Sequence, residues 1–129
     1  MSQSRTAPAP PTRGQLSERA AVADGAVQGL LDALDDADCR AILAATSDEA
    51  LSAKEVAGTC DLPLSTAYRK LGLLVDVGMI EERTRIRRHG KHASEYVRSV
   101  DEVVVALGAR GELEIAVDRR EAADRRSRA

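Results

Sequence analysis

The stretch that decides the fold runs from Leu51 to Arg98 and reads LSAKEVAGTCDLPLSTAYRKLGLLVDVGMIEERTRIRRHGKHASEYVR. It predicts two short helices around a tight turn, followed by a two-stranded hairpin with a basic tip. Ser52 and Glu55 have the spacing of an S-x-x-E capping box, and the apolar Leu51 and Val56 are placed for a hydrophobic staple. Two independent start signals therefore predict a first helix. It is expected to run to about Cys60 and to be about two turns long.

The turn and the second helix follow directly. Asp61 stands where the chain must reverse, and Asp tolerates a left-handed conformation better than most residues. Pro63 presets the start of a helix from about Leu64 to Val77, and Gly78 is a typical residue at a helix end. One side of this helix is apolar and predicts a buried face: Ala67, Leu71 and Leu74.

The opposite side of the same helix opens with the polar segment STAYRK, residues 65–70. Ser65 and Thr66 can donate to phosphates or base edges, and Arg69 one turn later can bind guanine O6 and N7 with two hydrogen bonds. A surface helix that is polar on its outer side is the simpler alternative. The preceding turn and the following basic hairpin favour contact with DNA.

The hairpin after this helix has the period of two that is typical of strands. From Ile80 onward, charged side chains alternate with apolar or small ones, and residues 88–92 form the loop before a return strand at Ala93–Ser99. Residues 79–98 hold six Lys or Arg and three acidic residues, a net charge of +3. Arginines on a strand suit phosphate binding, and they also protect a sheet edge from aggregation. Both roles are compatible.

The flanking segments complete the organisation. Residues 1–15 are rich in proline and are expected to be a disordered tail. The domain is expected to span 16–100, with an N-terminal helix from about Leu16 whose second half is better defined, then a break at the acidic run 32–38 and a new helix ending near Ser47. Residues 101–118 alternate as a second hairpin whose apolar face must meet a core or another subunit. Residues 119–129 lack apolar spacing and are expected to be a flexible basic tail.

Composition bounds the class of protein. The chain has 129 residues, a net charge of −2 and no Phe or Trp, so its core must be aliphatic. Cys39 and Cys60 lack metal-site or disulfide spacing, which favours a reducing compartment and buried thiols. No apolar run approaches the roughly 20 residues of a membrane span, and the N-terminus has no signal-peptide core. We expect a soluble cytoplasmic protein without a membrane partner.

The order of these elements resembles the winged helix-turn-helix. The amino-acid sequence of these segments resembles the ArsR-like regulators, more narrowly those of halophilic archaea. The resemblance covers about half of the chain. It is carried by ALDDADCRAIL (Ala33–Leu43), LSAKEVAGTCDLPLSTAYRKLGLLVDVGMIEE (Leu51–Glu82) and RRHGKH (Arg87–His92).

The resemblance implies a mainly α fold with a small antiparallel sheet (α+β), here a winged helix-turn-helix with an extra C-terminal β-hairpin. It also implies a homodimeric transcriptional regulator that binds double-stranded DNA, with the second helix of the motif in the major groove. The implied DNA contacts are Ser65, Thr66, Tyr68, Arg69 and Lys70 on that helix, and Arg85, Arg87, Arg88, His89 and Lys91 on the wing.

Departures from the family pattern limit what can be carried over. Asp61 replaces a frequent glycine and Pro63 a frequent serine, and neither forbids the turn. Metal-sensing members carry a Cys-x-Cys pair that this chain lacks, so we predict no metal and no cofactor. His89 and His92 have no Cys or carboxylate at ligand spacing.

Other classes of function receive less support. The sequence has no nucleophile–base pair, phosphate loop or paired carboxylates, so an enzyme is not expected. The alternative to a DNA-binding regulator is a winged-helix protein-interaction module that uses the apolar face of hairpin 101–118.

Overall fold

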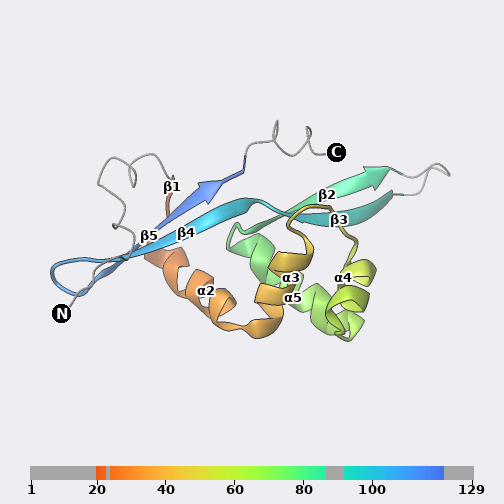
Figure 1. The fold of residues 1–129 in the computed structure, drawn as a ribbon, viewed down its shortest axis with the longest axis horizontal. Helices are drawn as coiled ribbons and strands as arrows, with labels where there is room; N and C mark the ends of the chain where they lie inside the picture. The colour runs from red at the N-terminus through yellow and green to blue at the C-terminus, as the bar shows by residue number, and fades with distance from the viewer. Residues whose placement is uncertain (1–19, 23, 87–91, 121–129) are drawn as a thin grey trace, which may run out of the picture.

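The computed structural model describes residues 20–22, 24–86 and 92–120. Helices lie on one side of the strands, and two hairpins extend toward opposite ends of the long axis (Figure 1). In chain order, the elements are β1 (Ala20–Ala21), α2 (Asp24–Asp35), α3 (Ala37–Ala45), α4 (Ala53–Cys60), α5 (Leu64–Asp76), β2 (Ile80–Ile86), β3 (His92–Arg98), β4 (Val100–Leu107) and β5 (Leu113–Arg119).

The helices enclose an aliphatic core. Leu30 of α2, Ile42 of α3, Val56 of α4 and Leu71 of α5 are fully buried and belong to one cluster. Full burial of such a side chain contributes about 1.5–3 kcal/mol. The core therefore holds α5 firmly from one side while its other side faces outward.

The wing sheet pairs β2 with β3 in antiparallel fashion, from Ile80 opposite Arg98 to Ile86 opposite His92. The segment before α4 joins this sheet through one bridge. Leu51 N–H donates to the Tyr96 carbonyl over 2.9 Å, and Tyr96 N–H donates back over 2.7 Å. The wing is thus attached to the residue that precedes the capping box.

The second sheet has the order β1–β5–β4 and packs against α2. Val103 faces Val117 and Val105 faces Ile115 across the β4–β5 hairpin. Ile115 and Val117 are buried in the same core cluster as the helices. The base of this hairpin is therefore part of the domain core.

Two arginines at the end of β5 tie this hairpin to the helices. Arg119 Nη1 donates to the Gly78 carbonyl over 2.7 Å. Arg120, whose side chain is only 5% exposed, forms an ion pair with Asp101 and hydrogen bonds with Ser47 Oγ over 3.0 Å and with the Ser47 carbonyl. The hairpin and the helices consequently form one body.

The predicted fold class is confirmed: the chain is an α+β winged helix-turn-helix with a C-terminal hairpin. Several boundaries differ. The return strand of the wing is His92–Arg98 rather than Ala93–Ser99. The N-terminal helix begins at Asp24 rather than near Leu16, and Ala20–Ala21 is a strand. The second hairpin begins at Val100, and it extends to Arg119 because this residue pairs with Val100. The expected tail at 1–15 and most of the tail at 119–129 lie outside the described residues.

Candidate nucleic-acid interface

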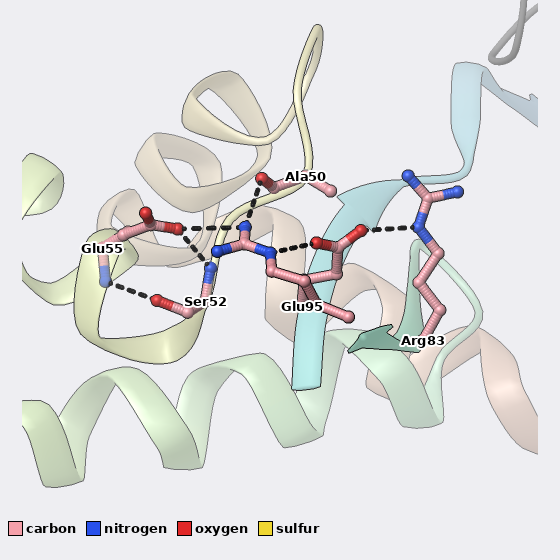
Figure 2. A network of polar contacts seen from close by, with 6 residues as sticks. Ala50, Ser52, Glu55, Arg83 and Glu95 are labelled. Carbon is pink, nitrogen blue, oxygen red and sulfur yellow. Dashed lines mark hydrogen bonds and ion pairs between the residues drawn. The ribbon is translucent and has the colours of Figure 1, made fainter. Parts of the chain in front are cut away.

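The start of α4 has the predicted capping box. Glu55 N–H donates to Ser52 Oγ over 3.1 Å, and Ser52 N–H donates to Glu55 Oε1 over 2.8 Å (Figure 2). The hydrogen bond from the Ser52 backbone lowers the pKa of the Glu55 carboxyl, assisted by Arg85. Leu51 and Val56 are both buried, as a hydrophobic staple requires. These local contacts fix the orientation of the first helix of the motif.

The turn between α4 and α5 depends on Asp61, which has φ 57° and ψ 52° in the left-handed region. Leu62 N–H donates to the Ala57 carbonyl over 2.9 Å and closes the end of α4. Pro63, with φ −58°, is the N-cap residue of α5 and provides no side-chain hydrogen bond to its first turn. The first amides of α5 are therefore not capped by this residue.

The two sides of α5 separate as predicted. Ala67, Leu71 and Leu74 are fully buried on the inner side. Among the predicted DNA contacts, Ser65, Tyr68 and Arg69 are exposed, and Thr66 is half-buried beside them. Tyr68 is the most notable, because 56% of this aromatic residue remains exposed. The structure thus brings four of the predicted residues together on one accessible surface.

Lys70 differs from its neighbours on α5. Its side chain is only 11% exposed, and its ammonium group donates to Asp36 Oδ2 and lies 3.9 Å from Asp38 Oδ2. Asp36 is the N-cap of α3 and also accepts a hydrogen bond from the Asp38 backbone N–H over 3.0 Å. The hydrogen bond from Lys70 lowers the pKa of the Asp36 carboxyl. Lys70 therefore attaches α5 to α3.

The wing arginines near the helices also form contacts with carboxylates of the same chain, and Figure 2 shows Arg83 beside Glu95. Arg85 Nε donates to Glu95 Oε1 over 2.6 Å, and its Nη2 lies 3.4 Å from Glu55 Oε1 and 3.3 Å from the Ala50 carbonyl oxygen. Arg83 Nε donates to Glu95 Oε2 over 3.0 Å. The network links both wing strands with the capping box of α4.

The ionisation of this network follows from its contacts. Partial burial alone would raise the pKa of Glu95, but hydrogen bonds from Arg85 and Arg83 outweigh burial and lower it. The hydrogen bond with Glu95 raises the pKa of Arg85. Both partners are thus charged at neutral pH, and Glu95 neutralises part of the positive charge that the sequence places on the wing.

The remaining wing candidates, Arg87, Arg88, His89 and Lys91, lie outside the described residues. His92 begins β3 and is exposed. Across residues 20–22, 24–86 and 92–120, no group of three or more His, Cys, Asp or Glu side chains is arranged to hold a metal ion. Cys39 is fully buried, and burial raises the pKa of its thiol to about 11.

Sequence reasoning did not identify Asp36, Glu95 and Tyr96 as residues that position this surface. Asp36 was recognised only as a member of an acidic run that provides a helix cap. Its contact with Lys70 joins residues 34 positions apart, and no local pattern encodes such a contact.

Among the helices that the structure describes, none has the length and apolar character needed to cross a membrane.

Comparison with known proteins agrees with this geometry. Residues 34–83 match a family described as helix-turn-helix domain. The match begins at the end of α2, includes α3, α4 and α5, and ends within β2. No curated protein and no solved structure matches the chain significantly. The segment from 34 to 83 is therefore a helix-turn-helix unit by both its sequence and its structure.

Proposed function

We propose that this chain is a sequence-specific transcriptional regulator that binds double-stranded DNA, with α5 in the major groove and the basic wing on the backbone. The observation that carries the proposal is the exposed surface of Ser65, Thr66, Tyr68 and Arg69 at the start of the second helix of a helix-turn-helix unit. In such units, the N-terminal residues of this helix contact base edges.

The four side chains are suited to different contacts with DNA. Arg69 can donate two hydrogen bonds to guanine, which discriminates between base pairs. Ser65 and Thr66 can donate to phosphates, and Tyr68 has a hydroxyl on an exposed ring. The first amides of α5, left uncapped by Pro63, suit a phosphate oxygen. We assign Lys70 to the positioning of α5, because its ammonium group already contacts Asp36.

The wing provides affinity rather than base choice in this proposal. Arg85, near the tip end of β2, attaches the wing to Glu55 of α4. Arg87, Arg88, His89 and Lys91 remain the predicted backbone contacts. Replacement of Arg87 and Arg88 by Ala should weaken binding to all sequences and make the salt dependence of binding shallower by about one to two phosphate contacts. We further propose an ArsR-like regulator that acts as a homodimer.

The test begins with selection of duplexes from a random pool. Arg69→Ala should weaken binding of the selected duplex by about 1–3 kcal/mol and relax the base preference, with the fold unchanged. The matched control is Lys54→Ala, which removes one positive charge from the exposed face of α4. The control should leave the ratio of specific to non-specific affinity unchanged. Unchanged base preference in Arg69→Ala would refute the assignment of α5.

The alternative is a winged-helix module that binds a protein and has no DNA specificity of its own. Exposed apolar side chains near the tip of the β4–β5 hairpin favour such a surface, since Leu107 is 72% exposed. Selection from the random pool also separates these hypotheses. An interaction module should enrich no duplex sequence.

A further inference from the structure

We propose that the outer edge of β4 is a docking surface for a second copy of this chain, through antiparallel pairing of the two β4 strands about a two-fold axis at Val105. This inference specifies the homodimer of the proposed function. It requires no contact with DNA.

The backbone of β4 provides the first argument. Within the described part of the chain, β4 is the last strand of the order β1–β5–β4, so one of its edges is open. Gly108 N–H donates to the Glu112 carbonyl over 2.7 Å. Hydrogen-bonded and non-hydrogen-bonded pairs alternate along an antiparallel ladder, so alternate residues of β4 direct their N–H and C=O groups outward. These residues are Val103, Val105 and Leu107.

The same alternation is visible on β5. Ile115, which pairs with Val105, accepts a hydrogen bond from Val22 N–H over 2.8 Å, on the β1 side of β5. The backbone groups of Ile115 therefore point away from β4, and those of Val105 point away from β5. The outward groups of β4 form a regular template for another strand.

The side chains from Val103 to Leu107 on this edge provide no charge that would prevent pairing. Natural edge strands are usually guarded by charges, prolines or bulges. β2, an edge strand of the other sheet, has the sequence IEERTRI, in which four of the seven residues are charged. In contrast, residues 103–107 read VVVAL and contain no charge and no proline. The irregularity of β4 lies at its base, between Val100 and Glu102.

The exposed apolar residues lie beside this edge. Val105 is 50% exposed, Leu107 72% and Leu113 41%, and all three lie on one face of the hairpin because Val105 and Leu107 are two residues apart and Leu113 faces Leu107. Further down the same face, Ile115 and Val117 are buried. The core thus covers the base of the apolar face and leaves its tip uncovered.

Symmetry favours a second copy as the occupant. Around a two-fold axis, each residue meets its own counterpart or a near neighbour, so a charged strand would bring like charges together. With Val105 on the axis, Val103 lies opposite Leu107 of the partner subunit, and the apolar residues form one continuous stripe. All outward backbone groups from Val103 to Leu107 find partners in this register.

The charged residues near β4 lie at the two ends of the strand, outside the apolar stripe. Antiparallel pairing places the base of one β4 beside the tip loop of the other. The base carries Asp101 and Glu102, and the tip loop carries the exposed Arg110. The Glu112 carboxylate of the same loop lies over Gly108, on the β4 side of the loop, and accepts a hydrogen bond from the Arg110 backbone N–H over 3.1 Å. Arg110 can approach the acidic base of the partner subunit's β4, but Glu112 lies beside it. Asp101 is already ion-paired with Arg120, so charge contributes little compared with the apolar stripe.

The contacts of Arg119 and Arg120 give this dimer a functional consequence. They attach the β4–β5 hairpin to Gly78, after α5, and to Ser47, after α3. A dimer formed at β4 would therefore hold the two α5 helices at a fixed separation. In a helix-turn-helix dimer, that separation determines the spacing of the two DNA half-sites.

The test is the mass of the protein in solution without DNA, measured by light scattering at concentrations up to about 100 µM, which detects micromolar association. The wild type should be a dimer. Val105→Lys and Val105→Glu should each raise the dissociation constant about 100-fold or more, because two like charges meet at the axis. An equimolar mixture of the two variants should recover the dimer, because opposite charges then face each other.

Two further variants make the result decisive. Leu113→Lys places a charge on the same face but on β5, and should weaken the dimer by less than about tenfold, since it lies off the paired edge. Leu107→Lys changes a more exposed side chain and provides a second edge variant if Val105→Lys does not fold. A monomeric wild type, or a dimeric Val105→Lys, would overturn the proposal, as would failure of the mixture to associate or equal dissociation by Leu113→Lys.

The outcome is independent of the test for DNA binding. A monomer that still selects a duplex would refute docking at β4 alone. A dimer that selects no duplex would refute the proposed function alone.

Discussion

The contact between Lys70 and Asp36 gives the sharpest prediction about the placement of α5. Lys70→Met keeps the long apolar stem and removes the ammonium group. Asp36→Asn keeps an oxygen that can cap α3 and removes the carboxylate charge. The two substitutions therefore isolate the ion pair from packing and from capping.

The magnitude follows from the burial of the two side chains, 11% exposed for Lys70 and 30% for Asp36. Exposed pairs contribute about 0.2–1 kcal/mol, and loss of one partner of a fully buried pair costs about 3–5 kcal/mol. This pair lies between these limits. We expect each single variant to lose about 1.5–2 kcal/mol of unfolding free energy, with a coupling energy of about 1 kcal/mol in the double-mutant cycle.

The assay is urea unfolding of the wild type, both single variants and the double variant. The slope of unfolding free energy against urea concentration should be the same for all four proteins if unfolding is two-state. A coupling energy below about 0.3 kcal/mol lies within ordinary additivity and would refute the attachment of α5 to α3 by this pair. Because Lys70 positions α5, Lys70→Met should also weaken the selected duplex more than a random one. Equal weakening of both would indicate a direct phosphate contact instead.

Three further predictions concern stability and are measured by the same unfolding assay. Lys70 lowers the pKa of Asp36 below 3.8, so the stabilisation by this carboxylate is present above about pH 4 and lost as pH falls through the lowered pKa; Asp36→Asn should be less sensitive to acid than the wild type, and equal acid sensitivity would contradict the assignment. Asp61→Ala should lose about 1 kcal/mol because alanine is strained in the left-handed region, whereas Asp61→Gly should be at least as stable as Asp61→Ala. Arg120→Met should lose about 2–3 kcal/mol of unfolding free energy because it removes the buried guanidinium that bonds Ser47 and Asp101. A loss below about 0.5 kcal/mol would show that packing alone holds the hairpin.

Local signals explain why the helix-turn-helix was predictable. The capping box of Ser52 and Glu55 acts within one turn of helix, and Asp61 affects only its own backbone angles. The buried positions of α5 repeat at helical spacing. Each of these features can be read from a few neighbouring residues, and the structure places all of them where the sequence predicts.

Contacts between distant segments explain what was not predictable. Lys70 and Arg85 were both predicted to contact DNA. In the structure they contact Asp36 and Glu55, which are 34 and 30 residues away in the sequence. The charge of each carboxylate was visible, yet its position relative to the cation depends on how helices and strands pack.

Strand pairing produced the other differences. Ala20–Ala21 has no alternation that could predict a strand, and it is a strand because it pairs with Val117 and Ala116 of β5. Arg119 likewise lies in β5 because Val100 pairs with it. A charged residue at the start of a basic tail offers no apolar signal. Such residues can be assigned only when their partner strand is known.

The most direct test of the account is the ratio of the affinities of the wild type for a selected duplex and for a scrambled duplex of the same length and composition, measured at one salt concentration. A sequence-specific regulator typically shows a ratio of about 10³ or more, and we expect a ratio in that range for this chain. A ratio near one, with binding that disappears as salt rises, would show that the positive charges bind DNA without reading it. That result would contradict the assignment of α5 as a recognition helix.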